Sequence, residues 1–121
     1  MITEETNRID IRIIYKSEEF EDFYAELSEN VKKKFEYVFN IIQTVYNLPN
    51  KFVKKLENTD LYEMRISVGT NEYRSILFAI DHENVIESTK IIMLTGFLKK
   101  SKKDYRKEIE KAENILNNLE L

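Results

Sequence analysis

The stretch LYEMRISVGTNEYRSILFAI, residues 61–80, decides the fold, because its two halves alternate in polarity on either side of a turn. Successive side chains of a strand point to opposite faces of a sheet, so a period of two predicts strands. We expect strands at 61–68 and 72–80, joined as a hairpin at Gly69-Thr70-Asn71. The first strand then has an apolar face and a polar face, formed by Tyr62, Met64, Ile66 and Val68 and by Glu63, Arg65 and Ser67.

Two further strands are expected outside this hairpin. Residues 86–97 are almost continuously apolar through Ile91-Ile92-Met93-Leu94, which is typical of a strand covered on both faces. We therefore place this strand in the centre of the sheet. Residues 8–15 alternate again, with one face formed by Ile9, Ile11 and Ile13 and the other by Arg8, Asp10, Arg12 and Ile14.

Apolar residues at helical spacing predict three helices. Ser17 is the expected N-cap of the first, which carries an apolar stripe from Phe20 to Leu27. The second runs from about Val31 to the stop at Asn47-Leu48-Pro49. Residues 51–57 are compatible with a further helical turn. The last helix is expected to be capped by Asp104 and to pack through Tyr105, Ile109, Ala112, Leu116 and Leu119.

The order strand, helix, helix, three strands, helix predicts an α+β fold. Hairpin strands pair antiparallel, so we expect an antiparallel sheet of about four strands packed by two N-terminal helices, plus a C-terminal helix. The length of 121 residues and the content of 2 Gly and 1 Pro fit a single domain over residues 1–121.

Composition narrows the classes of function. The chain has no Cys, which excludes disulfides, thiolate nucleophiles and cysteine metal sites, and its only histidine, His82, lies in a polar turn and is assigned no role. The first residues are acidic rather than typical of a signal peptide, and no run of residues is long and apolar enough to span a membrane. We therefore expect a cytoplasmic protein that has no membrane association and no cofactor.

The net charge of −3 conceals a charge separation along the chain. Residues 1–30 contain nine acidic and three basic residues, whereas residues 90–107 contain seven basic residues and one acidic residue. Basic side chains also stand on both hairpin strands, at Arg65 and Arg74. Cations on adjacent strands can hold a phosphodiester and offset the charge that develops during its cleavage. The sequence thus predicts a local site for a polyanion.

These residues also resemble a known family. The strand order, the segment Leu61-Tyr62-Glu63-Met64-Arg65, the pair Tyr73-Arg74 and the segment Gly96-Phe97-Leu98-Lys99-Lys100-Ser101 before a charged helix resemble the RelE/HigB superfamily of toxins from type II toxin–antitoxin systems, and within it the phage-derived HigB-like branch. The resemblance implies a RelE-like fold and a ribosome-dependent mRNA endonuclease that inhibits translation without a metal. It also implies a cognate helix-turn-helix antitoxin as partner, besides the ribosome and mRNA.

The resemblance assigns roles to individual residues. Arg65 and Arg74 take the positions of the strand arginines that bind the scissile phosphate, Lys99 or Lys100 takes the basic position after the last strand, and Tyr105 takes that of the tyrosine that contacts a base or the 2′-oxygen. The basic helix start adds three RNA-binding candidates, Lys102, Lys103 and Arg106.

Several alternatives stay open on the sequence alone. Glu63 either accepts the 2′-proton or balances the charge of Arg65, and we favour charge balance. Tyr105 either contacts RNA or belongs to the buried stripe of the last helix. The run from Lys99 to Lys107 is either an RNA-binding face or a solvated one. The alternative function is a non-catalytic protein-binding module of the same fold, such as a ParE-like gyrase-binding toxin.

Overall fold

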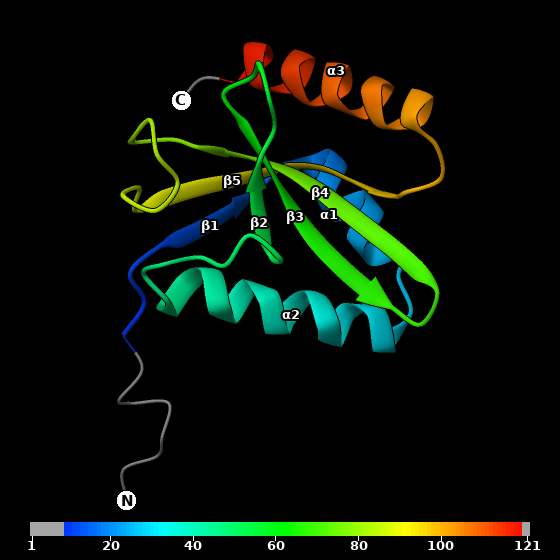
Figure 1. Ribbon diagram of the computed structural model, residues 1–121, viewed down its shortest axis with the longest axis horizontal. Coiled ribbons are helices and arrows are strands. Elements are labelled where there is room, and N and C mark those ends of the chain that lie inside the picture. The colour runs from blue at the N-terminus through cyan, green and yellow to red at the C-terminus, as the bar shows by residue number, and fades with distance from the viewer. Residues whose placement is uncertain (1–8, 120–121) are drawn as a thin grey trace, which may run out of the picture.

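The computed structural model describes residues 9–119. Five strands form one sheet in the order β1-β5-β4-β3-β2, with helices on both of its faces (Figure 1). The elements in chain order are β1 (Ile13–Lys16), α1 (Glu18–Ala25), α2 (Glu29–Thr44), β2 (Val53–Lys55), β3 (Leu61–Val68), β4 (Asn71–Ala79), β5 (Lys90–Leu98) and α3 (Lys102–Asn118).

The predicted α+β class is confirmed, with a mixed sheet in place of a purely antiparallel one. β2, β3, β4 and β5 pair antiparallel in sequence, and β1 pairs parallel with β5. The fifth strand is β2, which lies where a helical turn at residues 51–57 was expected. Three residues are too few to show an alternating pattern, so β2 is defined by its pairing with Tyr62–Met64 of β3.

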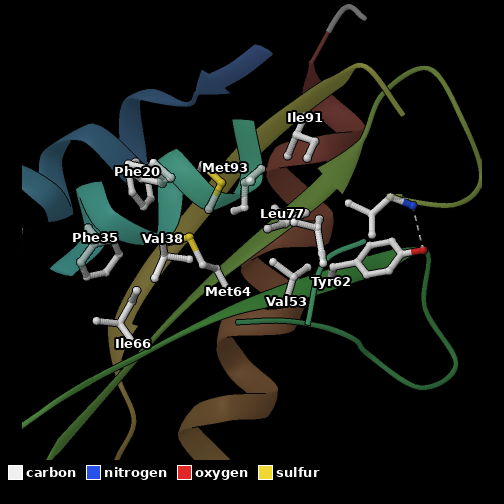
Figure 2. Close-up of a cluster of buried hydrophobic side chains, with 14 of the residues drawn as sticks. Phe20, Phe35, Val38, Val53, Tyr62, Met64, Ile66, Leu77, Ile91 and Met93 are labelled. Atoms are coloured by element: carbon white, nitrogen blue, oxygen red, sulfur yellow. Dashed lines mark hydrogen bonds between the residues drawn. The ribbon is translucent and has the colours of Figure 1, made fainter. Parts of the chain in front are cut away.

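The sheet separates two apolar clusters, each of which is covered by helices on its own face (Figure 1). α1 and α2 cover one face of the sheet, where Phe20 and Phe35 pack against strand residues such as Met64 and Met93 (Figure 2). α3 covers the other face through the stripe that the sequence predicted, in a cluster with Ile76, Leu94 and Phe97. Each face of the hairpin is therefore buried under a different helix.

The expected strand at residues 8–15 is wrong in its extent. β1 begins only at Ile13, and Arg8 lies outside the described residues. Ile9 is 77% exposed and Ile13 54% exposed, whereas Arg12 is 1% exposed. The alternating pattern here does not mark a long strand. It places the buried Arg12 directly before β1, where its side chain holds this segment against the rest of the fold.

Arg12 uses every one of its five N–H groups on backbone carbonyls. They donate to the oxygens of Ile42, Val45 and Tyr46 at the end of α2 and to those of Val85 and Ile86 before β5, at distances of 2.6–3.2 Å. Carbonyl groups at a helix C-terminus carry partial negative charge and stabilise a cation. Burial lowers the pKa of Arg12 from its usual value.

Serine side chains start all three helices. Ser17 accepts a hydrogen bond from the amide of Phe20, as expected, and Ser28 caps α2 in the same way through Val31. α3 begins earlier than predicted, because Ser101 and not Asp104 is its N-cap. Ser101 is the third residue after the end of β5, so only Lys99 and Lys100 connect the strand to the capped start of the helix.

The remaining strand boundaries differ slightly from expectation. β3 matches residues 61–68, and β4 starts one residue early and ends one residue early. β5 begins at Lys90 rather than 86, because side chains of Asn84 and Ser88 hydrogen-bond to the backbone and hold residues 84–88 in a turn. β5 is an interior strand between β1 and β4, while β4 holds the central position.

Candidate functional site

Two predicted site residues lie in one row across the sheet. Arg65 of β3 is directly opposite Arg74 of β4, and Arg74 is opposite Phe97 of β5. Opposed residues on neighbouring strands project from the same face. Because Phe97 belongs to the apolar cluster under α3, the row lies on the α3 face, near the end of β5 that leads into that helix.

Glu63 lies within ion-pair distance of both arginines. Its Oε1 is 3.5 Å from Nε of Arg65, and its Oε2 is 3.9 Å from Nε of Arg74. Opposed guanidinium groups repel each other, and a carboxylate close to both offsets that repulsion. The geometry is therefore that of charge balance, one of the two roles that the sequence left open for Glu63.

The two arginines differ in their access to solvent. The Arg65 side chain is 33% exposed, whereas that of Arg74 is 3% exposed. Arg74 also donates through Nη1 to Oε1 of Glu72 at 3.3 Å and to the carbonyl of Tyr73 at 2.9 Å. Arg65 can meet a ligand directly, while Arg74 is enclosed in this conformation.

The buried pair of Glu63 and Arg74 retains unused hydrogen-bonding capacity. In the described part of the chain, Oε2 of Glu63 and Nε of Arg74 are buried without a hydrogen-bond partner, although they face each other across 3.9 Å. Unsatisfied buried polar groups are uncommon in folded proteins, and a functional role is one of their recognised explanations. The pair therefore keeps one donor and one acceptor that no described protein group satisfies.

Glu72 extends the charged network into the next row. A hydrogen bond from Ser67 lowers the pKa of Glu72, with further lowering by Arg74 and Arg65, against an opposing effect of desolvation. Ser67 and Glu72 are directly opposed on β3 and β4. Glu72 thus stays ionised near neutral pH and balances part of the arginine charge.

The end of β5 brings Lys99 and Tyr105 to the same end of the sheet. The amide of Lys99 donates to the carbonyl of Glu72 at 2.7 Å, which extends the β4–β5 pairing past Leu98. The half-buried Tyr105 packs edge-on against Phe97 with ring centroids 5.4 Å apart, and Nζ of Lys99 lies 6.0 Å from the Tyr105 ring. Tyr105 therefore belongs to the packed stripe of α3, one of its two predicted alternatives, and its ring also lies near the ammonium group of Lys99.

The other basic candidates surround the start of α3. Lys100 lines a surface pocket of about 320 Å³ with Phe97, Asp104 and Glu108. Desolvation raises the pKa of Glu108, whose Oε2 is buried without a hydrogen-bond partner among the described residues. The three remaining cations are exposed on the first turns of the helix: Lys102, Lys103 and Arg106.

Sequence reasoning overlooked the most buried cation in the described chain, Arg12. Its five carbonyl partners make it a structural residue rather than a ligand-binding one. A signal did exist in the sequence, since Arg12 stands among four isoleucines between Ile9 and Ile14, with Asp10 as the other charged residue. That signal shows that the residue is unusual, but its partners come from segments 30 or more residues away.

Among residues 9–119, no cluster of His, Cys, Asp or Glu side chains is arranged to hold a metal ion. His82 accepts a hydrogen bond from the amide of Asn84 through Nδ1 within its turn. None of the helices that the structure describes is long and apolar enough to cross a membrane.

The fold is similar to that of a solved bacterial toxin. A mutant of the E. coli toxin RelE in the free state superimposes with a TM-score of 0.59, at 12% identity, over 84% of this chain and 97% of RelE. The RelE fold is likewise found with a TM-score of 0.50 and 14% identity in the intact E. coli RelBE toxin–antitoxin complex, over 75% of this chain and 98% of that one. The predicted RelE-like fold is therefore confirmed.

Residues 22–117 match the family described as phage-derived protein Gp49-like. The chain belongs to this family, as the resemblance to the phage-derived branch predicted. No curated protein sequence matches the chain significantly. The matched range contains every residue of the candidate site, from Glu63 on β3 to Arg106 on α3.

Proposed function

We propose that this protein is the toxin of a type II toxin–antitoxin system and cleaves mRNA on the ribosome. The observation that supports the proposal best is the meeting of Arg65, Arg74, Lys99 and Tyr105 at one end of the α3 face, although they come from three strands or strand ends and a helix. Membership of the Gp49-like family and the RelE fold agree with it.

The proposed reaction is an internal phosphoryl transfer. The 2′-oxygen of the nucleotide loses its proton and attacks the adjacent phosphorus, and the bond from phosphorus to the 5′-oxygen breaks. The leaving oxygen takes up a proton, giving a 2′,3′-cyclic phosphate and a 5′-hydroxyl end. Negative charge grows on the phosphate oxygens during the transfer, so nearby cations stabilise the transition state.

The exposed groups take the contacts with RNA in this proposal. Arg65 and either Lys99 or Lys100 bind the scissile phosphate, because their side chains reach solvent at this end of the sheet. Tyr105 contacts a base or the 2′-oxygen. The exposed cations at the start of α3 attract the RNA backbone without reading its sequence: Lys102, Lys103 and Arg106.

Arg74 is buried, so it can contact a phosphate only after a conformational change. Its side chain is 3% exposed, so in this conformation it positions Glu63 and Arg65 rather than touching phosphate. Direct contact with a phosphate requires the groups that cover Arg74 to move away from it. We propose that RNA binding drives this movement, because a phosphate would satisfy the free Nε of Arg74.

A cognate antitoxin is the proposed protein partner. The solved complex with the same fold is described as an intact toxin–antitoxin complex, in which RelE is bound to RelB. By the same logic, a helix-turn-helix antitoxin would hold the present chain inactive until it is released. Copurification with the product of a neighbouring reading frame tests this partner directly.

The burial of Arg74 favours a second candidate function. Its charge is already balanced by Glu63 and Glu72, as in a purely structural network. A non-catalytic module that binds a protein, such as a ParE-like gyrase-binding toxin, would need no accessible arginine. That function would tolerate substitution of Arg65, which takes no part in the buried contacts of Arg74 with Glu72.

Induction of the protein in growing cells separates the two functions. The nuclease predicts growth arrest together with new ends in translated mRNAs, and both effects weaken in Arg65→Ala. Lys33→Ala, an exposed lysine of α2 remote from the row of arginines in sequence, serves as the control. Growth arrest without new mRNA ends, or arrest that persists unchanged in Arg65→Ala, would support the binding module instead.

A further inference from the structure

A basic pocket opens at the edge of the sheet beside β3, apart from the pocket at the start of α3. It has a volume of about 410 Å³ and is lined by Lys34, Tyr37, Lys51, Phe52, Arg65 and Ser67. β2 pairs with Tyr62–Met64 of β3, and the amide of Arg65 donates to the carbonyl of Phe52, just before β2, at 2.8 Å. Among the described residues, no strand pairs with β3 beyond Arg65 on this side. α2 and the segment before β2 complete the walls of this edge pocket.

The edge pocket has an unusual charge for an acidic chain. Its lining contains three cations and no carboxylate, while the whole protein carries a net charge of −3. Nζ of Lys34 lies 5.5 Å from the ring of Tyr37, and Nζ of Lys51 lies 4.9 Å from the ring of Phe52. Each ring therefore has an ammonium group next to it, available to an incoming anion.

The two rings give the pocket a surface on which a planar group can stack. Tyr37 and Phe52 contact each other edge-on, with centroids 6.1 Å apart and planes at 74°. Tyr37 is 54% exposed, although a large aromatic ring on a helix would usually be buried. Exposed aromatic rings between cations are the arrangement that binds single-stranded nucleic acid, because bases stack on the rings while phosphates pair with the cations.

Arg65 connects the edge pocket to the candidate catalytic row. Its side chain lines the pocket and also contacts Glu63, beside Arg74. An RNA strand whose phosphate is held by Arg65 would thus extend over the edge of β3 toward Tyr37. The neighbouring nucleotide is then within reach of the two lysines.

We propose that the edge pocket is a second binding subsite for single-stranded RNA, in which Tyr37 stacks on a base next to the scissile phosphate and Lys34 and Lys51 pair with the backbone. This subsite rests on the proposed nuclease function for its place in the reaction, but binding itself does not require cleavage. An acidic protein segment is the competing occupant of a cationic pocket, and the experiment distinguishes it.

The test measures binding of a fluorescent single-stranded RNA oligonucleotide to the purified protein without ribosomes. Lys34→Ala/Lys51→Ala is expected to bind roughly tenfold more weakly and to reduce the salt dependence of binding, since each lost phosphate contact removes a slope of about 0.7 in log K against log salt. Lys33→Ala/Lys90→Ala removes the same charge from exposed lysines outside the pocket and is expected to bind like the wild type.

Substitutions of Tyr37 test the stacking separately from the charge. Tyr37→Leu is expected to weaken RNA binding roughly tenfold, whereas Tyr37→Phe, which keeps the ring, binds like the wild type. Neither change should affect an abasic oligonucleotide of the same length. Because Tyr37 is exposed, both variants are expected to fold, and their circular dichroism spectra check this.

Three results would overturn the subsite. These are equal loss of binding in the two double variants, equal loss in Tyr37→Leu and Tyr37→Phe, and binding of a polyglutamate peptide as tight as that of RNA. The outcome is independent of the proposed nuclease. RNA binding that depends on Lys34, Lys51 and Tyr37 in a protein that cuts no mRNA would support the subsite and exclude the nuclease. Cleavage of mRNA by a protein whose RNA binding is unaffected by these substitutions would support the nuclease and exclude the subsite.

Discussion

Arg65 and Arg74 occupy directly opposed positions on β3 and β4, with the carboxylate of Glu63 within 3.9 Å of both guanidinium groups. Opposed like charges destabilise a sheet unless a counter-charge is near. The row is therefore maintained at a cost in stability that Glu63 offsets. Such a concentration of charge on one face of two strands is expected where the protein must bind an anion.

The first prediction concerns this carboxylate. Glu63→Gln keeps the shape of the side chain but leaves Arg74 buried without a full counter-charge, so we expect a loss of about 3 kcal/mol in the free energy of unfolding. Urea denaturation followed by circular dichroism measures it. Glu57→Gln, at an exposed position, is the control and is expected to change stability by less than about 0.5 kcal/mol. Equal stability of the two variants would show that Glu63 is not needed for charge balance.

The second prediction concerns the buried arginine before β1. Arg12→Lys keeps the positive charge but leaves three donors on one nitrogen to serve five carbonyls. We expect a loss of about 3 kcal/mol, since hydrogen bonds to charged groups contribute roughly 1.5–3 kcal/mol each. The same change at the exposed Arg106 should leave the urea midpoint unaltered. A midpoint for Arg12→Lys equal to that of the wild type would contradict the role assigned to the five bonds.

The third prediction concerns why residue 96 is a glycine. Gly96 belongs to the segment that carried the family resemblance. A Cβ atom at this position would overlap the ring of Phe23 on α1, so the glycine is needed for packing and not for flexibility. Gly96→Ala is expected to cost about 1–3 kcal/mol. If the ring is the cause, Gly96→Ala costs much less when it is introduced into Phe23→Ala. A full additive loss in the double variant would point to a different cause.

The fourth prediction concerns pH. Burial raises the pKa of Glu108, so the folded state binds a proton more tightly than the unfolded state. Stability from this group is then complete below the ordinary pKa of glutamate and falls as the pH rises through the higher folded value. Glu108→Gln should therefore be more stable than the wild type at pH 7, with the difference vanishing in acid. Thermal melts across this range measure it, with Glu110→Gln at an exposed position as the control. A gain that persists in acid would show that the effect is not electrostatic.

Local patterns in the sequence were sufficient to predict the hairpin and the helices. The alternation in residues 61–80 placed Glu63 and Arg65 on the face opposite Met64, and the structure has them there. The stripe from Tyr105 to Leu119 correctly predicted the packed face of α3. Periodicity succeeds in these elements because the side chains that pack against one layer recur at the spacing of the element, two residues in a strand and three or four in a helix.

The features that the sequence did not predict depend on contacts between segments that are distant in the chain. β2 is visible only through its pairing with β3, and the position of Arg12 depends on carbonyl groups of α2 and of the turn before β5. The burial of Arg74 could not be read from the strand pattern either, because an arginine in an alternating strand is ordinarily expected to reach solvent. The edge pocket joins α2 to β3, so its basic character is also hidden in the sequence.

The most direct test of the central proposal maps RNA ends in a purified translation reaction. Primer extension on an mRNA translated with the wild-type protein is expected to show new ends that appear only when ribosomes are present. Arg65→Ala should reduce their yield about a hundredfold, in keeping with the loss of one charge-stabilising contact, while Lys33→Ala cuts like the wild type. Translation arrest by the wild type without any new RNA end, or equal cutting by Arg65→Ala, would contradict a nuclease centred on the opposed arginines.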